Sequence, residues 1–223
     1  MVIGIRARLC LLCFTQLGVS SMVTIERLNS CQESHWQAVI SLYENSFPAW
    51  EREPISAIED NIAAGDSFCV IALENNSVVG AYICDVNRDL KFLLLSYVFV
   101  DEKQQGKGIG KLLCGHLKQY QEEQSATFNW LFLETEDFNM GFYFGLGYRK
   151  LDFEYLSPHF DSEESTPMSL MVAHQEDITP LTQSVLKKII TNMFTHGYGL
   201  TSQSKRLAIQ LGKIPSNIIL LTQ

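Results

Sequence analysis

The sequence lacks an excess of positive charge. Its 223 residues include 17 Lys and Arg against 25 Asp and Glu, which gives a formal net charge of -8 at pH 7. Proteins that bind nucleic acid neutralise phosphates with clustered Lys and Arg, so this balance argues against a nucleic-acid partner. A cationic partner suits the charge better.

Long hydrophobic runs are also missing. A membrane-spanning helix needs about 20 consecutive apolar residues, and no segment reaches that length, so we expect no membrane partner. Residues 9–19 are apolar but interrupted, and they follow Arg6 and Arg8 in the manner of an imperfect secretory signal. Because Met22 precedes a strand-like segment, we expect residues 1–21 to be an N-terminal extension from an upstream start, with a signal-like segment as the alternative.

Metal-binding patterns are absent as well. The six cysteines are scattered, and Cys10 with Cys13 has no second Cys pair or His cluster to complete a tetrahedral site. We therefore expect no metal. Cys69 and Cys84 lie inside apolar runs, which is typical of reduced thiols in a core and favours a cytoplasmic location.

What the sequence does contain is a regular succession of short apolar runs and amphipathic stretches. Apolar residues make up 46% of the chain, enough to build a folded core. No repeat or low-complexity linker divides it. The pattern predicts one mixed α/β domain over residues 22–175, followed by a helical extension over residues 176–223 that packs on the domain or at a homodimer interface.

The predicted elements follow from periodicity and from turn residues. Residues 92–100 are almost wholly apolar, which indicates a central strand covered on both faces. Asn75-Asn76 favours a tight hairpin turn. The expected helices are 33–46, 54–65, 109–121, 139–146, 180–194 and 204–211, and the expected further strands are 68–73, 78–84, 128–134, 148–155 and 168–172. In the helix after residue 108, Ile109, Leu112, Leu113, Leu117 and Tyr120 form the predicted buried face, and Lys111, Lys118 and Gln121 the exposed one.

The central strand runs into a glycine-rich loop, Gly106-Lys107-Gly108-Ile109-Gly110, and then into a helix. Such a loop exposes backbone N–H groups at a helix N-terminus, so it suits a phosphate-bearing ligand. The Walker pattern is not met, since three residues separate Gly106 from Gly110 and no Ser or Thr follows Lys111. The dinucleotide pattern lacks its third glycine. Gln105 with Gly108 and Gly110 does satisfy Arg/Gln-x-x-Gly-x-Gly/Ala.

A second segment follows at a fixed distance: Leu131-Phe132-Leu133-Glu134, Asn139, and then Phe142 to Tyr148. With the glycine loop, this order resembles the GNAT superfamily of acyl-CoA-dependent N-acetyltransferases over residues 23–173. The resemblance implies an α/β fold with a mixed, mostly antiparallel central sheet flanked by helices on both faces. It also implies acetyl-CoA (coenzyme A) as the cofactor.

The resemblance assigns cofactor contacts as well. It implies that backbone groups of the splayed central strand hold the pantetheine arm and polarise the thioester carbonyl, and that the glycine loop holds the pyrophosphate. Asn139 matches a position that often bonds the cofactor, although Asp-Phe-Asn is also an ordinary helix N-cap. The cofactor residues expected in this way are Val98, Phe99, Val100, Gln105, Gly106, Lys107, Gly108, Ile109, Gly110, Lys111, Asn139 and Tyr143.

The resemblance also implies that Tyr143 protonates the departing thiolate, which suits a phenol with a pKa near 10. The alternative is a core tyrosine within the aromatic set Phe138, Phe142, Tyr143, Phe144 and Tyr148. No general base is marked. Glu134, at a strand end, is the catalytic candidate, and Glu51 and Glu53 are expected to attract the substrate amine. For each glutamate the alternative is a solvated surface carboxylate or a salt-bridge partner, and water can relay the proton instead.

These observations together predict an N-acetyltransferase. It would move an acetyl group from acetyl-CoA to a primary amine of a small molecule or a peptide, by direct transfer in a ternary complex. The alternative is a catalytically silent coenzyme A-binding sensor or interaction module.

Overall fold

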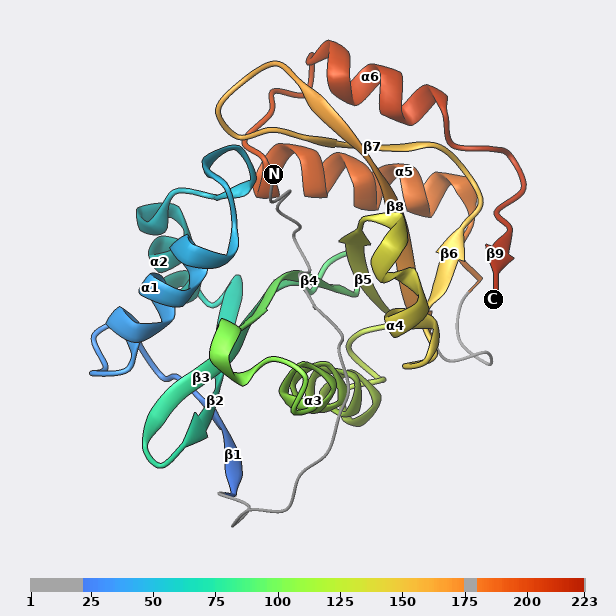
Figure 1. Cartoon of the computed structure of the whole chain (residues 1–223). Helices are drawn as coiled ribbons and strands as arrows, with labels where there is room; N and C mark the ends of the chain where they lie inside the picture. Colours follow the sequence, from blue (N-terminus) through green and yellow to red (C-terminus); the bar gives the residue numbers. More distant parts are fainter. Residues whose placement is uncertain (1–21, 175–179, 223) are drawn as a thin grey trace.

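The computed structural model describes residues 22–174 and 180–222. The sheet has the order β1-β2-β3-β4-β5-β8-β6-β9, and β7 pairs with β8 (Figure 1). The strands are β1 (Val23–Arg27), β2 (Ser67–Glu74), β3 (Ser77–Asn87), β4 (Phe92–Val100), β5 (Trp130–Thr135), β6 (Arg149–Leu151), β7 (Tyr155–Pro158), β8 (Ser165–His174) and β9 (Leu220–Leu221). The helices are α1 (Trp36–Ser46), α2 (Ile55–Ala64), α3 (Ile109–Glu123), α4 (Met140–Phe144), α5 (Gln183–Asn192) and α6 (Lys205–Gly212). Short 3-10 turns, η1 (Ala49–Glu51), η2 (Glu102–Gln104) and η3 (Asp137–Asn139), and a π-helical turn, η4 (Met193–Gly197), complete the described part of the chain.

Helices cover both faces of the sheet, and the alternation along β4 shows which helix covers which face. Leu93 and Leu95 pack in one core cluster with α3 and α4, whereas Phe92 and Leu94 pack with α5. Further along β4, Phe99 packs with α1 and α2. The helices α1, α2 and α5 therefore share one face, and α3 and α4 lie on the other (Figure 1). This mixed, mostly antiparallel α/β architecture confirms the expected fold class.

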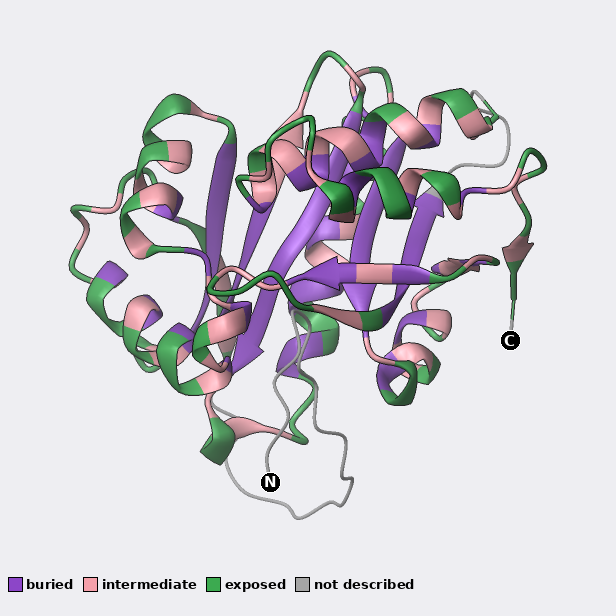
Figure 2. Cartoon of the chain, turned by 90° about the horizontal axis from the view of Figure 1, so that it is seen from above, coloured by how far each residue is buried: buried purple, intermediate pink, exposed green. Residues whose placement is uncertain are grey.

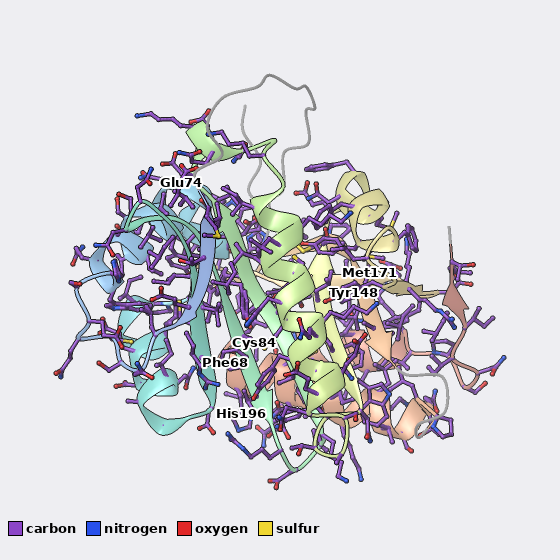
Figure 3. All side chains as sticks on the ribbon, turned by 90° about the horizontal axis from the view of Figure 1, so that it is seen from below. Phe68, Glu74, Cys84, Tyr148, Met171 and His196 are labelled. Atoms are coloured by element: carbon purple, nitrogen blue, oxygen red, sulfur yellow. The ribbon has the colours of Figure 1, made fainter. Side chains whose placement is uncertain are left out.

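All nine residues of β4 are buried, as expected for a strand covered on both faces. Figure 2 shows the buried residues gathered along the central strands and on the inner sides of the helices. On the α3 side, Figure 3 shows Phe68 and Cys84 to one side of the helix and Tyr148 and Met171 to the other. All four belong to the cluster beneath α3.

The pairing of β4 changes halfway along the strand. Ile83 of β3 pairs with Tyr97 but Cys84 pairs with Leu95, so Ser96 is the extra residue of a β-bulge. The parallel pairing of β4 with β5 covers only residues 92–95 and 130–133. Beyond Leu95, β4 continues on β3 alone. The two parallel strands therefore separate at the bulge.

Several sequence expectations hold and others are wrong. The hairpin turn has φ of 50° at Asn75 and 63° at Asn76, and α2 ends at Gly65 with φ of 79°. The predicted strand 148–155 is instead two strands, because the chain bends after Leu151 and β6 and β7 pair with different halves of β8.

Three side chains are placed differently from the expectation. Gln121 is buried, because its amide donates to the carbonyl of Phe128 at 3.2 Å and ties the end of α3 to the segment that enters β5. Leu112 is 44% exposed and Phe138 is 70% exposed, so neither is a core residue. Phe138 lies in η3, where Asn139 is the buried residue.

The C-terminal helices pack on the sheet. Leu186, Ile189 and Ile190 of α5 share a core cluster with Phe92 of β4 and Phe132 of β5. No helix among the described residues has the length and apolar character to cross a membrane. The expectation about residues 1–21 lies outside the described residues.

Candidate active site

The glycine loop leaves backbone open at the start of α3. Gly106 has φ of 79° and Gly108 has φ of 83°, conformations that L side chains rarely adopt. Gly108 immediately precedes the first helical residue, Ile109, and a Cβ placed on it would meet no atom within 4 Å. The first N–H groups of α3 therefore adjoin an open, side-chain-free surface, which is the arrangement that binds phosphate.

Gln105 attaches this loop to the strand, and two lysines place positive charge beside it. Gln105 donates from its amide to the carbonyl of Val100 at 3.3 Å, so it fixes the loop to the end of β4. Lys107 donates to Gln104 at 2.5 Å, and both Lys107 and Lys111 are exposed. Two ammonium groups are thus available to an anion at the loop.

The backbone of Val98, Phe99 and Val100 lies where β4 has left β5. Val98 and Val100 pack into the cluster beneath α3, and Phe99 packs on the α1 side. Ser96, at the bulge, donates to Asp85 at 2.5 Å. An extended ligand that starts at the glycine loop can follow this edge of β4 and find backbone partners there.

Tyr143 lies in α4 within the same cluster as Val98 and Val100. It is fully buried, and its hydroxyl has no hydrogen-bond partner in the part of the chain that the structure describes. Burial, with Cys114 and Tyr148 nearby, raises the pKa of Tyr143 well above its usual value, so the hydroxyl keeps its proton. A buried hydroxyl without a partner costs roughly 1–3 kcal/mol.

Asn139 is buried directly before α4. It occupies the N-cap position of α4, as the sequence alternative has it, but its side chain makes no capping hydrogen bond to the helix. It stays a candidate for cofactor contact.

Glu134 is the first residue of β5 beyond the pairing with β4, and it is only 2% exposed. Tyr198 donates to its Oε2 at 2.6 Å, and Tyr155 of β7 donates to its Oε1. The hydroxyls of Ser157 and Tyr198 are also hydrogen-bonded to each other. Glu134 is therefore a buried carboxylate within a polar network and not a surface charge.

Glu51 and Glu53 are buried as well, at 3% and 8% exposure, which rules out the surface alternative for both. Tyr97 of β4 holds their segment, because its hydroxyl donates to the carbonyl of Glu51 at 3.1 Å and accepts from the N–H of Glu53 at 3.0 Å. The Glu53 carboxylate accepts from Asn61 at 3.3 Å.

Two loops that are far apart in the sequence contact each other over this face of the sheet: the segment that carries Glu51 and Glu53, and the β7–β8 loop. The N–H of Phe160, after β7, donates to the carbonyl of Trp50 in η1 at 2.9 Å. The Trp50 and His159 rings lie 4.2 Å apart, and Phe160 stacks on Tyr198 at 5.1 Å. The segment before α2 and the β7–β8 loop thus join over the face that carries α1, α2 and α5.

A cavity of about 750 Å³ opens on that same face, between α2 and the segment from Asn192 to Gly197. Asp66, Asp85 and Asp89 line it together with Phe92 and Leu94 of β4, and none of its lining residues is Lys or Arg. Its electrostatic character is therefore acidic. Among the described residues, His, Cys, Asp and Glu form no group of three that could hold a metal ion.

Ser157 and Tyr198 have no sequence signal for a place at this site. Tyr198 lies 64 residues from Glu134 and beyond the segment that resembles a known family. Only the packing of the tail on the sheet brings the two together. The aromatic residues around Tyr143 likewise give no indication that its hydroxyl is unsatisfied.

A parallel strand pair that separates next to a glycine loop, with a buried tyrosine beside it, is the arrangement of a coenzyme A-dependent acyltransferase. The sequence model of the acetyltransferase (GNAT) family matches residues 36–148. The chain therefore belongs to the GNAT family of acetyltransferases, and acetyl-CoA is its cofactor. Among curated proteins, none matches the sequence.

Solved structures share the fold at low sequence identity. A GNAT-family acetyltransferase from Bacteroides thetaiotaomicron superposes with a TM-score of 0.66 and 18% identity, covering 80% of this chain and 99% of its own. Spermidine N-acetyltransferase from Vibrio cholerae, in complex with CoA and spermine, has a TM-score of 0.56 and 14% identity, covering 70% and 97%. A GNAT acetyltransferase from Elizabethkingia anophelis with acetyl-CoA bound has a TM-score of 0.51 and 18% identity, covering 69% and 98%.

Proposed function

We propose that this protein is an N-acetyltransferase that transfers the acetyl group of acetyl-CoA directly to a primary amine in a ternary complex. The observation that carries the proposal is the pair of separating strands. A cofactor loop and Tyr143 lie on the α3 face, and buried carboxylates lie on the opposite face. Two ligands that approach from different sides can meet where β4 leaves β5.

On the cofactor side, the backbone at the start of α3 and the loop from Gln105 to Lys111 hold the pyrophosphate. The backbone of Val98, Phe99 and Val100 binds the pantetheine arm and stabilises negative charge on the carbonyl oxygen. Gly106 and Gly108, with positive φ, keep this surface free of side chains. Acetyl-CoA, when bound there, supplies an activated acetyl thioester.

On the acceptor side, Glu134 takes one proton from the ammonium group, directly or through water, and passes it to solvent. With acetyl-CoA bound, the neutral amine would form the C–N bond as the C–S bond breaks. Tyr143 would donate a proton to the departing sulfur and would be reprotonated by the proton that the new amide nitrogen loses. For each acetyl group transferred, one proton goes to the sulfur and one to solvent.

The acceptor is a cationic amine, on a small molecule or a peptide. The buried carboxylates of Glu51, Glu53 and Glu134 and the acidic cavity all lie on the acceptor face, and each would attract an ammonium group. We also propose a cytoplasmic location. It is supported by Cys69, Cys84 and Cys114, which are buried free thiols.

The proposal is tested by an assay of acetyl transfer. Purified protein is given acetyl-CoA and a panel of mono-, di- and polyamines and amine-bearing peptides, with release of free thiol measured and the acetylated product identified by mass spectrometry. Matched alcohols serve as the control, and we expect thiol release with amines only. Binding of acetyl-CoA without transfer to any amine would favour the coenzyme A-binding sensor instead.

A further inference from the structure

Tyr198 lies in the tail of the chain, outside the residues that match the family, yet it contacts the buried carboxylate at the centre of the acceptor face. Its hydroxyl donates to Oε2 of Glu134 at 2.6 Å. Glu134 is on β5 and Tyr198 follows α5, so the contact joins the sheet to the C-terminal extension.

The backbone around Tyr198 fixes the position of its ring. The π-helical turn η4 ends α5, and the N–H of Tyr198 donates to the carbonyl of Met193 at 3.2 Å. This wider turn inserts a residue relative to an α-helix and is frequent at functional sites. The Tyr198 ring packs between Phe160 at 5.1 Å and Phe194 at 5.8 Å, and it is 6% exposed. Because the ring is held on both sides, its hydroxyl is directed toward Glu134.

The donor and the acceptor of each hydrogen bond around Glu134 can be assigned. A tyrosine hydroxyl has one proton, and Tyr198 gives its proton to Glu134, so Ser157 must donate to the Tyr198 oxygen. Tyr155 donates to the other carboxylate oxygen. Donors on both oxygens fix the plane of the carboxylate and stabilise its charge in a buried site.

We propose that Tyr198 is a positioning residue for acetyl transfer, through which the C-terminal extension completes the active site. It holds the Glu134 carboxylate in the orientation that accepts a proton from the acceptor ammonium. The residues just before Tyr198, from Asn192 to Gly197, bound the cavity on the same face of the sheet, so the C-terminal extension also shapes the surface of this face. This inference rests on the proposed N-acetyltransferase function.

The competing explanation is that Tyr198 only fastens the tail to the sheet. The full chain with Tyr198→Phe tests this, because the change removes one hydroxyl and keeps the ring. Tyr82→Phe is the matched control. Tyr82 is fully buried, and its hydroxyl is hydrogen-bonded to His116 at 2.9 Å, but it lies in the cluster beneath α3 on the opposite face. We expect both variants to lose a similar, small amount of thermal stability, about 2–4 °C.

Activity separates the two explanations. With the best amine from the panel, we expect Tyr198→Phe to lower kcat about 10–100-fold, with the KM for acetyl-CoA unchanged. We expect the acid limb of its kcat/KM profile to move to higher pH, because the carboxylate has lost a donor to its charged form. The difference in kcat/KM between Tyr198→Phe and the unmodified protein should become smaller at high pH, because the amine is already neutral there. Tyr155→Phe, which removes the other donor, should change the profile in the same direction.

Failure of the positioning role can be distinguished from failure of the proposed function. If the unmodified protein acetylates an amine but Tyr198→Phe has the kcat and pH profile of the Tyr82→Phe control, the positioning role is refuted and the tail is only structural. If the unmodified protein acetylates no amine, the proposed function fails and this inference fails with it.

Discussion

Substitution of Gly108 by Asp is the sharpest test of the cofactor loop. The position has φ of 83° and open space around it, so an added side chain meets no atom but stands at the start of α3. A carboxylate there adds negative charge where the N–H groups of the helix would hold pyrophosphate. The change therefore acts on binding through charge and on folding through the backbone.

The two effects have different sizes. The left-handed conformation costs an L residue roughly 1–2 kcal/mol, with Asp at the low end. Two unit charges about 4 Å apart repel by about 4 kcal/mol near a protein surface and by about 1 kcal/mol in bulk water. Gly108 is exposed, so about 2–3 kcal/mol is a fair expectation, which weakens acetyl-CoA binding roughly 30–150-fold.

Gly65→Asp is the matched control for this experiment. Gly65 has φ of 79° and no atom within 4 Å of an added Cβ, but it ends α2 and is not in the glycine loop. Both variants gain the same charge and a similar backbone strain. Acetyl-CoA is titrated into each by calorimetry, and urea unfolding measures stability. Equal affinity of the two variants for acetyl-CoA would refute the assignment of the pyrophosphate to this loop.

Four further predictions concern three positions, Tyr143, Gly80 and Cys114. Tyr143→Phe should lower kcat about 10–100-fold while calorimetry finds the acetyl-CoA Kd nearly unchanged; unchanged turnover would exclude the acid role. Gly80→Ala should cost about 1–3 kcal/mol in urea unfolding, because the new Cβ would lie 2.9 Å from the carbonyl oxygen of Phe99; a stability equal to that of the unmodified protein would show that β3 and β4 can separate there. Burial raises the pKa of Cys114 to about 12, so its thiol should be alkylated far more slowly than the partly exposed Cys31 in peptide mapping at pH 8.5. Because the folded pKa of Cys114 lies above the unfolded one, its contribution to stability is complete below about pH 9 and is lost as the pH rises toward 12, which urea unfolding across that range measures.

Local sequence determined the elements that build the cofactor side. The almost wholly apolar run at 92–100 favours a strand with two covered faces, and Gly106 and Gly108, between this strand and the next helix, favour an exposed backbone turn. These features depend on neighbours in sequence, so they can be predicted from periodicity and from the conformational freedom of glycine. The hairpin at Asn75-Asn76 follows for the same reason.

The acceptor side was decided only by the tertiary structure. Nothing in the sequence near Glu51, Glu53 or Glu134 indicates that the three carboxylates are buried, because burial depends on segments that pack over them from far along the chain. The contact of Tyr198 with Glu134 spans 64 residues and depends on a π-helical turn that no local pattern predicts. Periodicity determines which face of an element is apolar, whereas the meeting of polar groups from distant elements is fixed only when those faces pack together.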